Sequence, residues 1–501
     1  MKIIKIRALL SLLFCLGSFT TLYAKDYIVT DFGAKGDGKT NNTAAIQKAI
    51  DKASQNGGTV VIPEGIYISG TLKLKSNITL EIQRNAILKG ITDRAAYPSL
   101  PIESPMLTSS GQWGHALIYA SKLENIAITG EGTIDGNGGD PIFDTKQNEN
   151  VMRPFVLLVV GCKNVKVSGL NLRNSAMWMQ RYIACDFLRI AGINVFNHCN
   201  ANNDGLDIDD CHEVIVSDCV IDADDDALCF KSEGERGVKN AVVTNCILAS
   251  HASAFKMGTG SVGGFQSIQF SNTVIRQSRA TNLVHIFRQK SGLTGIDLAS
   301  TDGAVLKDVN ISNVSIDSLE TPIFLRLGNR MGRKTAPRPG VFEDVHFSQI
   351  TIKNAGPITS AITGFPGTYI KDVSFRDIFI EHLGGGAARD TSLQVPENSN
   401  QYPGSRMFSK KRLPATAFYV RHVKNIQFNN VRVKLINADV RPALVLDDVE
   451  DAEIAGLKYP AAATTPTQVI VANSKDISIN GNLKEGETLK SIKSSGIKIN
   501  R

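Results

Sequence analysis

A short phrase that recurs along the chain is the feature that most limits its fold. Each copy has a small or apolar residue, two spacers, alternating apolar positions and then a second short apolar strand. Copies begin at Cys162, Cys185, Cys211, Val238, Phe265, Leu306, Phe342, Ile370, Val423 and Val449. The early copies are spaced by roughly 23 to 27 residues, about the length of one coil of a β-solenoid. One coil cannot bury its apolar face alone, so we expect the coils to stack around a continuous core.

Composition and charge exclude several classes of protein. The 501 residues are 42% hydrophobic and 21% charged, which is globular and neither disordered nor collagen-like. The net charge is +7 and falls to about +4 without the basic N-terminus, too little to indicate a nucleic-acid partner. No stretch after the N-terminus is long and apolar enough to span a membrane. We therefore expect a monomer without a nucleic-acid partner or a membrane span.

The N-terminus has the pattern of a secretory signal peptide. Lys2, Lys5 and Arg7 precede an apolar run from Ala8 to Leu16, and a polar stretch ends at Ala24. We expect residues 1–24 to be this leader and residues 25–501 to form a single β-helix domain. The protein is then exported, to a periplasm or out of the cell.

The cysteines fit the repeat better than a metal site. None of the 8 cysteines forms a Cys-x-x-Cys pair, so no zinc cluster is indicated and we expect no metal or cofactor. Cys162, Cys185 and Cys211 occupy equivalent places in the repeat, as do Cys219 and Cys246. Stacked coils lie about 4.8 Å apart, within reach of a disulfide, but small inward-facing thiols are the favoured interpretation.

The segment before the repeats points to a capped solenoid. Asp31–Thr43 leads into a predicted helix over residues 44–53, and strands begin in Gly57–Tyr67. An amphipathic helix at this place covers the open end of the core and the unpaired edges. The apolar positions of this helix are Ile46, Ala49, Ile50 and Ala53. The segment resembles the pectin-lyase-like superfamily, which implies an all-β, single-stranded right-handed parallel β-helix with an N-terminal capping helix.

Two coils are longer than the others. They run from Ile268 to Val309 and from Val373 to Ile426. The second contains Gly384-Gly385-Gly386 and the turn-rich run Pro396–Pro403, which indicates a surface excursion rather than a domain boundary.

Two acidic runs are the strongest candidates for chemistry. Asp204 and Asp226 are 22 residues apart, and His251 lies 25 residues beyond Asp226, so coiling stacks the three as a ladder. Crowded carboxylates raise one another's pKa, and a protonated carboxyl beside an ionised one is what cleavage of a glycosidic bond needs. The alternative is that these aspartates cap turns, which we favour for Asp210 and Asp222.

Here the sequence resembles glycoside hydrolase family 28, the polygalacturonases, including its divergent bacterial members. Asn202-Asn203-Asp204 and Gly205-Leu206-Asp207 match the family's Asn-Thr-Asp and Gly-Ile-Asp, and Asp224-Asp225-Asp226 matches its Gly-Asp-Asp. The resemblance implies that Asp225 is the general acid and that Asp204 and Asp226 activate water for inversion. It gives His251 a supporting catalytic role.

The sequence departs from that family where the uronate should bind. Asp297-Leu298-Ala299 stands in place of Arg-Ile-Lys, and a substrate carboxylate facing Asp297 would be repelled. Ser250-His251-Ala252 replaces Gly-His-Gly and brings Lys256 near. Arginine and lysine side chains elsewhere can replace the missing cations, and Trp178 can stack on a sugar or pack in the core. The candidate substrate-binding residues are Asn202, Lys256, Arg288, Lys290, Arg326, Arg330 and Trp178.

The favoured function is an exported, metal-free, inverting hydrolase that acts on a pectic polysaccharide or its oligosaccharides. The long coils suggest a cleft narrowed toward attack on chain ends. Two alternatives stay open: a lyase that binds Ca²⁺ at the aspartates and uses a basic side chain, and a β-helical carbohydrate-binding protein without catalysis. Adjacent coils suggest carboxylates about 5 Å apart, whereas inversion usually needs roughly 6.5 to 9.5 Å. The sequence does not resolve that difference.

Overall fold

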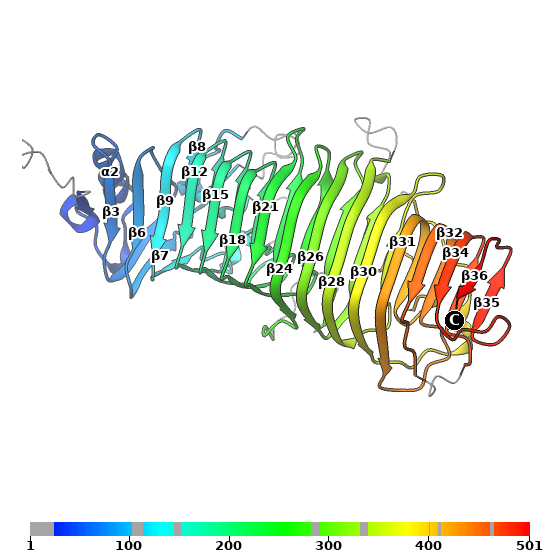
Figure 1. The fold of residues 1–501 in the computed structure, drawn as a ribbon. Coiled ribbons are helices and arrows are strands. Elements are labelled where there is room, and N and C mark those ends of the chain that lie inside the picture. Colours follow the sequence, from blue (N-terminus) through cyan, green and yellow to red (C-terminus); the bar gives the residue numbers. More distant parts are fainter. Residues whose placement is uncertain are drawn as a thin grey trace, which may run out of the picture.

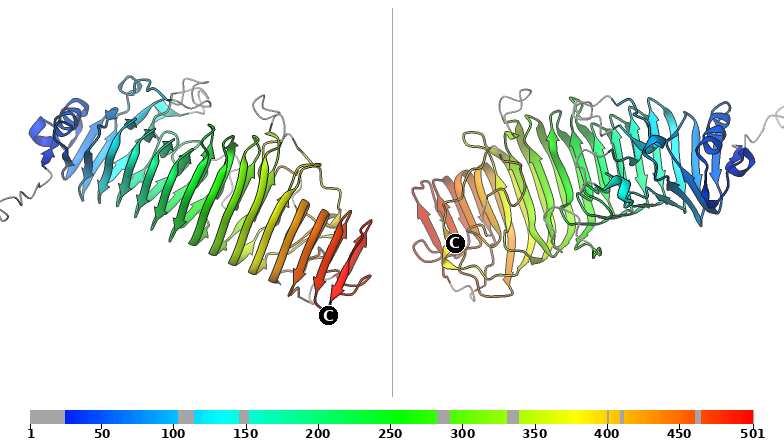
Figure 2. Two further views of the ribbon diagram at one scale, coloured as in Figure 1. Left: turned by 45° about the horizontal axis from the view of Figure 1, so that its top comes forward. Right: turned by 180° about the vertical axis from the view of Figure 1, so that it is seen from behind.

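Parallel strands stack coil upon coil into a rod, with helix α2 (Thr43–Ala53) at one end and the C-terminus at the other (Figures 1 and 2). This is the predicted right-handed parallel β-helix. The computed structural model describes residues 25–102, 114–144, 152–281, 291–330, 339–399, 401–408, 412–460 and 465–500.

The strands form three faces, defined here by the pairing of each strand with its equivalents in the next coils. The first face contains β5 (Leu72–Lys73), β8 (Ala116–Ser121), β11 (Phe155–Val160), β14 (Gln180–Ile183), β17 (Leu206–Asp209), β20 (Leu228–Ser232), β23 (Ser253–Ser261), β25 (Gly292–Ser300), β27 (Leu319–Leu327), β29 (Ser360–Thr363), the starts of β31 (Phe418–Leu435) and β32 (Leu444–Ala455), β33 (Val469–Ala472) and β35 (Leu489–Ile492). The second face contains β1 (Asp26–Ile28), β3 (Gly58–Ile62), β6 (Ile78–Ile82), β9 (Glu124–Gly130), β12 (Lys163–Ser168), β15 (Asp186–Ala191), β18 (His212–Ser217), β21 (Val238–Thr244), the first halves of β24 (Phe265–Arg276), β26 (Val305–Asp317), β28 (Val341–Ala355) and β30 (Ile370–His382), later parts of β31 and β32, β34 (Lys475–Asn480) and β36 (Lys498–Asn500). The third face contains β2 (Asp37–Asn41), β4 (Gly65–Ser69), β7 (Ala86–Gly90), β10 (Thr133–Asp135), β13 (Asn171–Arg173), β16 (Asn194–Asn197), β19 (Val220–Ala223), β22 (Ile247–Ser250) and the second halves of the long strands from β24 to β31.

Helix α2 closes the N-terminal end of the core. Its apolar positions Ile46, Ala49, Ile50 and Ala53 are all buried, as the sequence predicts. The helix begins one residue earlier than expected, at Thr43, and packs against β1, β3 and β5. Four short 3-10 helices, η1 (Val29–Phe32), η2 (Arg94–Ala96), η3 (Pro141–Phe143) and η5 (Ala388–Thr391), lie in turns and connections of the described chain.

Inward side chains of all three faces fill one continuous core. Cys162, Cys185 and Cys211 lie in it, one in each of three successive coils, and the backbone N–H of Cys185 donates to the Cys211 sulfur at 3.3 Å. Every cysteine among the described residues is a free thiol, as the small-residue interpretation predicts. Corner asparagines stack outside the core: Asn125 donates to Asn77 at 2.9 Å and Asn164 to Asn125 at 2.8 Å. All three have a positive φ, which asparagine tolerates better than most residues.

Two apolar clusters cover the outer side of the first face and leave a gap between them. The first cluster packs Leu100, Met177 and Trp178 over the outward residues of β8, β11 and β14. The second cluster is formed by the connection between β30 and β31, here called the excursion (residues 383–399, 401–408 and 412–417). Its side chains pack on the outward residues of β27, β29, β31, β32 and β33. The predicted surface excursion is therefore folded back onto the first face.

Among the described residues, no helix has the length and apolar character that crossing a membrane requires.

Candidate active site

Three aspartates meet at the edge of the first face, in the gap between the two apolar clusters. Asp204 precedes β17, and Asp225 and Asp226 precede β20. β17 and β20 pair with Leu206 opposite Leu228, so Asp204 lies beside Asp226 of the next coil. One carboxylate oxygen of each aspartate lies within 4.8 Å of the other two. The predicted stacking of Asp204 on Asp226 is confirmed, but His251, expected in the same stack, lies opposite Asp224 instead.

The turn that carries Asp204 is fixed by its neighbours. The backbone N–H of Gly205 donates to the Asp226 carbonyl at 2.9 Å, and a Cβ at Gly205 would lie 2.5 Å from the Ala227 carbonyl oxygen. Only glycine allows that approach. Asn203 stands where the related motif has threonine, and both polar atoms of its side-chain amide form hydrogen bonds that fix the turn. Its oxygen accepts from the backbone N–H groups of Cys199 and Asn200, and its nitrogen donates to the carbonyls of Ser175 and Met177.

Burial and mutual repulsion keep a proton on the aspartate cluster. Asp204 is 2% exposed, and burial, followed by the charges of Asp207 and Asp225, raises its pKa well above the usual range. Asp225 is the least buried of the three. Crowding therefore perturbs the protonation of this cluster, a condition that acid catalysis at a glycosidic oxygen exploits, although the raised pKa itself belongs to Asp204.

Lys256 and Asp297 extend the cluster into the following coils. Lys256 Nζ lies 2.8 Å from Asp226 Oδ2. Burial, the largest single effect, lowers the pKa of Lys256, but Asp226 and the groups around it together outweigh burial and raise that pKa well above its usual value. Asp297 on β25 pairs in register with Lys256 on β23, and burial raises its pKa to about 7, although Lys256 lowers it. Ser253 Oγ donates to Asp297 Oδ2 at 3.2 Å.

His251 lies in a second buried cluster next to the aspartates. Its Nδ1 is 2.9 Å from Asp224 Oδ1, and its ring packs edge-on against the ring of His198 at 5.1 Å between centroids. His198 Nε2 is 2.9 Å from Asp222 Oδ1, and Arg276 Nη1 donates to the other oxygen of Asp222 at 3.2 Å. Acids and imidazoles alternate in this ladder, which holds His251 in one orientation. Asp222 therefore pairs with a histidine rather than serving only as a turn cap.

A network of buried charges lies along the first face beside Asp204. Arg181 Nη2 donates to Asp209 Oδ2 at 2.5 Å, and Lys231 Nζ lies 3.1 Å from Asp207 Oδ1. Burial raises the pKa of Asp207 to about 6, although Lys231 and Arg181 lower it. The cationic groups of Arg181 and Lys231 stand 4.7 and 4.6 Å from the ring centre of Trp178. Each cation therefore has both a carboxylate and an aromatic face.

Asp225 and Asp226 open into a pocket of about 510 Å³. The described residues that line it come from the turns with Asn202, Asp225 and Asp226, from β23 and β25, and from the excursion segment Tyr402–Met407. The excursion is fastened there: Tyr402 Oη lies 2.5 Å from Thr259 Oγ1, and Arg406 makes two hydrogen bonds to Glu320 at 3.0 and 2.7 Å. Excursion residues therefore form one fixed wall of the pocket.

The structure brings only some of the predicted substrate-binding residues to the pocket. Asn202 and Lys256 line the pocket, and Asn202 Oδ1 accepts from Arg153 at 3.1 Å. Arg288 and Lys290 lie outside the described residues.

Three of the candidates lie outside the described lining of this pocket. Trp178 is packed in the first apolar cluster, so core packing rather than sugar stacking explains it. Arg326 is 2% exposed and donates to the carbonyls of Gly364 and Glu397, so it holds the excursion. Arg330 forms a two-bond ion pair with Asp302. None of the three is among the described residues that line the pocket.

The sequence interpretation missed His198, Arg181, Asp209 and Lys231. A usable signal existed, because Arg181 lies opposite Asp207 and Asp209 lies opposite Lys231 across successive coils. A search for opposite charges one coil apart on the first face would have found these pairs.

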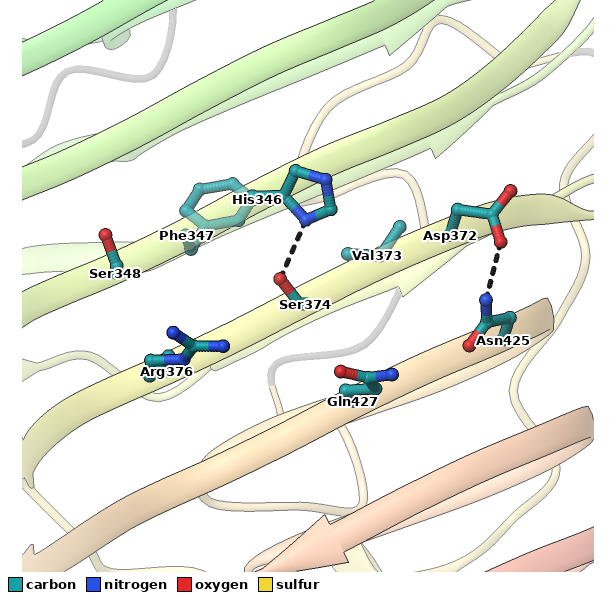
Figure 3. Close-up of a pocket in the computed structure, with 9 residues that line it drawn as sticks. All are labelled: His346, Phe347, Ser348, Asp372, Val373, Ser374, Arg376, Asn425 and Gln427. Atoms are coloured by element: carbon teal, nitrogen blue, oxygen red, sulfur yellow. Dashed lines mark hydrogen bonds between the residues drawn. The ribbon is translucent and has the colours of Figure 1, made fainter.

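A second hollow lies on the outer surface of the second face (Figure 3). The described residues that line it do not include a cluster of carboxylates. It measures about 360 Å³ and lies over β28, β30 and β31. In Figure 3, His346 points toward Ser374 at 2.8 Å, and Asp372, the one carboxylate among the residues drawn, accepts from Asn425 at 2.7 Å. These polar side chains bond to their neighbours across the sheet surface.

Among the described residues, two groups of side chains have the spacing to hold a metal ion. One is the aspartate cluster of Asp204, Asp225 and Asp226, and the other is His198, Asp224 and His251. The all-carboxylate group would suit a hard cation such as Ca²⁺, and the mixed group a transition metal.

Comparison with known proteins decides the family. A family model described as glycosyl hydrolases family 28 matches residues 54–402. The chain belongs to this family. It is therefore a polygalacturonase-like glycoside hydrolase of the pectin-lyase-like superfamily, and the resemblance in its acidic motifs is confirmed.

Individual relatives are distant. A probable polygalacturonase of Vitis vinifera is 24% identical over 384 residues, covering 72% of this chain and 75% of the relative. An exo-poly-alpha-D-galacturonosidase of Dickeya chrysanthemi is 23% identical over 464 residues, covering 81% and 75%. The structure of a family 28 exopolygalacturonase of Yersinia enterocolitica matches with a TM-score of 0.67 at 22% identity, over 87% of this chain and 79% of that one. The structural match concerns the fold.

Removing Arg181 tests the buried charge network of this family 28 site. In Arg181→Met, Asp209 loses its 2.5 Å partner inside the protein, so we expect the free energy of unfolding to fall by about 3–5 kcal/mol. The matched control is Arg84→Met, because Arg84 pairs with Glu131 while both side chains are exposed, at 76% and 61%. We expect that change to cost less than about 1 kcal/mol. Urea unfolding measures both; equal effects of the two substitutions would contradict the assignment.

Proposed function

We propose that the protein hydrolyses glycosidic bonds of a pectic polysaccharide or its oligosaccharides with inversion at the anomeric carbon. The carrying observation is the stack of Asp204, Asp225 and Asp226, whose oxygens lie within 4.8 Å of one another at the pocket.

Each aspartate has a distinct role in this proposal. Asp225 is the general acid, since it is the least buried of the three and lines the pocket, where a leaving-group oxygen can meet it. Asp204 and Asp226 hold the attacking water. One water molecule can donate hydrogen bonds of about 2.8 Å to two oxygens that are this far apart. The short distance therefore allows Asp204 and Asp226 to act together as the general base. The acid Asp225 lies within the same 4.8 Å of both bases, closer than the roughly 6.5 to 9.5 Å usual between acid and base in inverting enzymes.

The lyase alternative has less support. A lyase of that kind needs an unprotonated basic side chain beside the bound cation. Lys256 is the base at the cluster, and Asp226 at 2.8 Å raises its pKa well above the usual value, which keeps it protonated. A protein that only binds carbohydrate has no use for a proton held on crowded carboxylates. Hydrolysis uses all three aspartates of the cluster.

Replacement of the general acid tests the chemistry. We expect Asp225→Asn to lower kcat on pectic oligosaccharides about 10³-fold, because an amide cannot supply the proton to the leaving group. Proton NMR of wild-type digests should show that the first product has the anomeric configuration opposite to the bond cleaved. Asp218→Asn, at an exposed corner where the Asp218 side chain accepts a hydrogen bond from Asn245, is the control and should keep wild-type activity. Retention of configuration, or an active Asp225→Asn enzyme, would refute the assignment.

We further propose that the enzyme attacks chain ends. Support comes from the two apolar clusters, which cover the first face on both sides of the aspartates. The wall Tyr402–Met407 is fixed by Thr259 and Glu320, so a long chain meets a barrier rather than an open groove.

The sizes of the early products test this mode of attack. We expect mono- or disaccharides from the first minutes of digestion, while the polymer shortens slowly. Arg406→Ala removes both bonds to Glu320 and loosens the wall, so we expect a broader range of product lengths from that variant. Chromatography of timed samples gives the answer. Tri- and tetrasaccharides as the first wild-type products would rule out attack on chain ends.

Export is also a proposal, supported by the basic and apolar pattern of residues 1–24. N-terminal sequencing of protein recovered outside the cytoplasm should read from Lys25. An N-terminus that still carries residues 1–24 would contradict it.

A further inference from the structure

Asp297 forms part of the pocket wall, although it has no part in the proposed chemistry. It lies on β25 in register with Lys256 on β23 and with Phe324 on β27, and all three point to the outer side of the first face. Its side chain is nearly inaccessible, at 4% exposure, yet the residue lines the pocket that holds Asp225 and Asp226. A sugar next to the catalytic aspartates therefore meets this carboxyl group.

The cations that line the pocket already have partners. Lys256 Nζ lies 2.8 Å from Asp226, and Arg406 is bound by both oxygens of Glu320. Within the described lining, these are the two cationic side chains, against three acids: Asp225, Asp226 and Asp297. A substrate carboxylate that entered this space would have to displace an existing ion pair, and it would lie close to the acids in a region that excludes water.

The remaining lining is suited to an uncharged sugar. Ala252, Leu293, Pro403 and Met407 offer apolar contact, and Tyr402 adds an aromatic ring. Such a surface accepts the C–H face of a pyranose, a methyl group or an ester. Ser253 supplies a hydroxyl group on the same side.

We propose that the position beside Asp297 takes an uncharged sugar residue, either neutral or with its carboxyl group esterified, and discriminates against a free uronate. This rests on the proposed pectic substrate and narrows it. Asp297 is the specificity-determining residue of this position.

The protonation state of Asp297 makes the discrimination against a free uronate depend on pH. Burial, with a smaller contribution from Asp226, raises its pKa to about 7 against the lowering effects of Lys256 and the Ser253 hydroxyl. Phe324 on the following strand is uncharged, and Tyr402 and Arg406 face the pocket from the excursion. Below pH 7 Asp297 is mainly a neutral acid, which repels a uronate little. Above pH 7 it is mainly ionised, so the discrimination should grow as the pH rises.

Binding to the inactive Asp225→Asn protein tests the inference without turnover. The probes are trigalacturonic acid and its triamide, which is nearly isosteric, uncharged and stable over the pH range. We expect calorimetry to show the triamide binding at least tenfold more tightly than the acid at pH 8, and no more than about threefold more tightly at pH 5.5. In Asp225→Asn/Asp297→Asn the ratio should not change with pH.

A second substitution separates this role from a structural one. Ser253→Ala, in the Asp225→Asn background, removes a hydrogen bond that lowers the pKa of Asp297, so the discrimination should appear at a higher pH than with Ser253 present. Acid that binds as tightly as the triamide at pH 8, or a ratio unaffected by Asp297→Asn, overturns the inference and leaves the hydrolase standing. Binding of neither probe counts against the pectic substrate, and the inference fails with it.

Discussion

The register between successive coils is the constraint on which the rest of the structure depends. Parallel pairing places each residue beside its equivalent in the next coil, as with Leu206 and Leu228 or Lys256 and Asp297. Backbone hydrogen bonds fix this register, so side chains of like charge are held together even where they repel. The site can therefore keep three carboxylates within 4.8 Å because the backbone ladder on either side opposes their separation.

Holding these charges inside the protein has a cost that the surroundings offset. Arg181 with Asp209 and Lys231 with Asp207 alternate in sign along the first face, and Trp178 lies against both cations. The two apolar clusters exclude water on either side of the aspartates. Removal of water strengthens each charge interaction and also raises the penalty for any unpaired group. This explains why the pocket cations already have protein partners.

The sequence predicted the features that follow from period and local chemistry. The coil length, the capping helix from its apolar positions and the stacking of Asp204 on Asp226 all depend on spacing alone, and the structure has them. It did not predict the place of Arg326 or Trp178. Both are functional residue types in a suitable stretch, but their roles depend on which segment folds over them. Contact between the excursion and Thr259, 143 residues apart, is not readable from local pattern.

Alternation along each strand explains how the pocket can change without harm to the core. On β23 and β25, Phe255, Met257, Ile296 and Leu298 point inward and belong to the core, whereas Lys256 and Asp297 between them point outward. An outward side chain changes the charge of the pocket and leaves the inward packing intact. The three aspartates lie in turns two or three coils away from β25, so they keep their positions whichever residue stands at 297. In the proposed mechanism, chemistry and specificity are thus carried by different parts of the coil, so the proposed catalytic stack is compatible with a pocket that does not favour a free uronate.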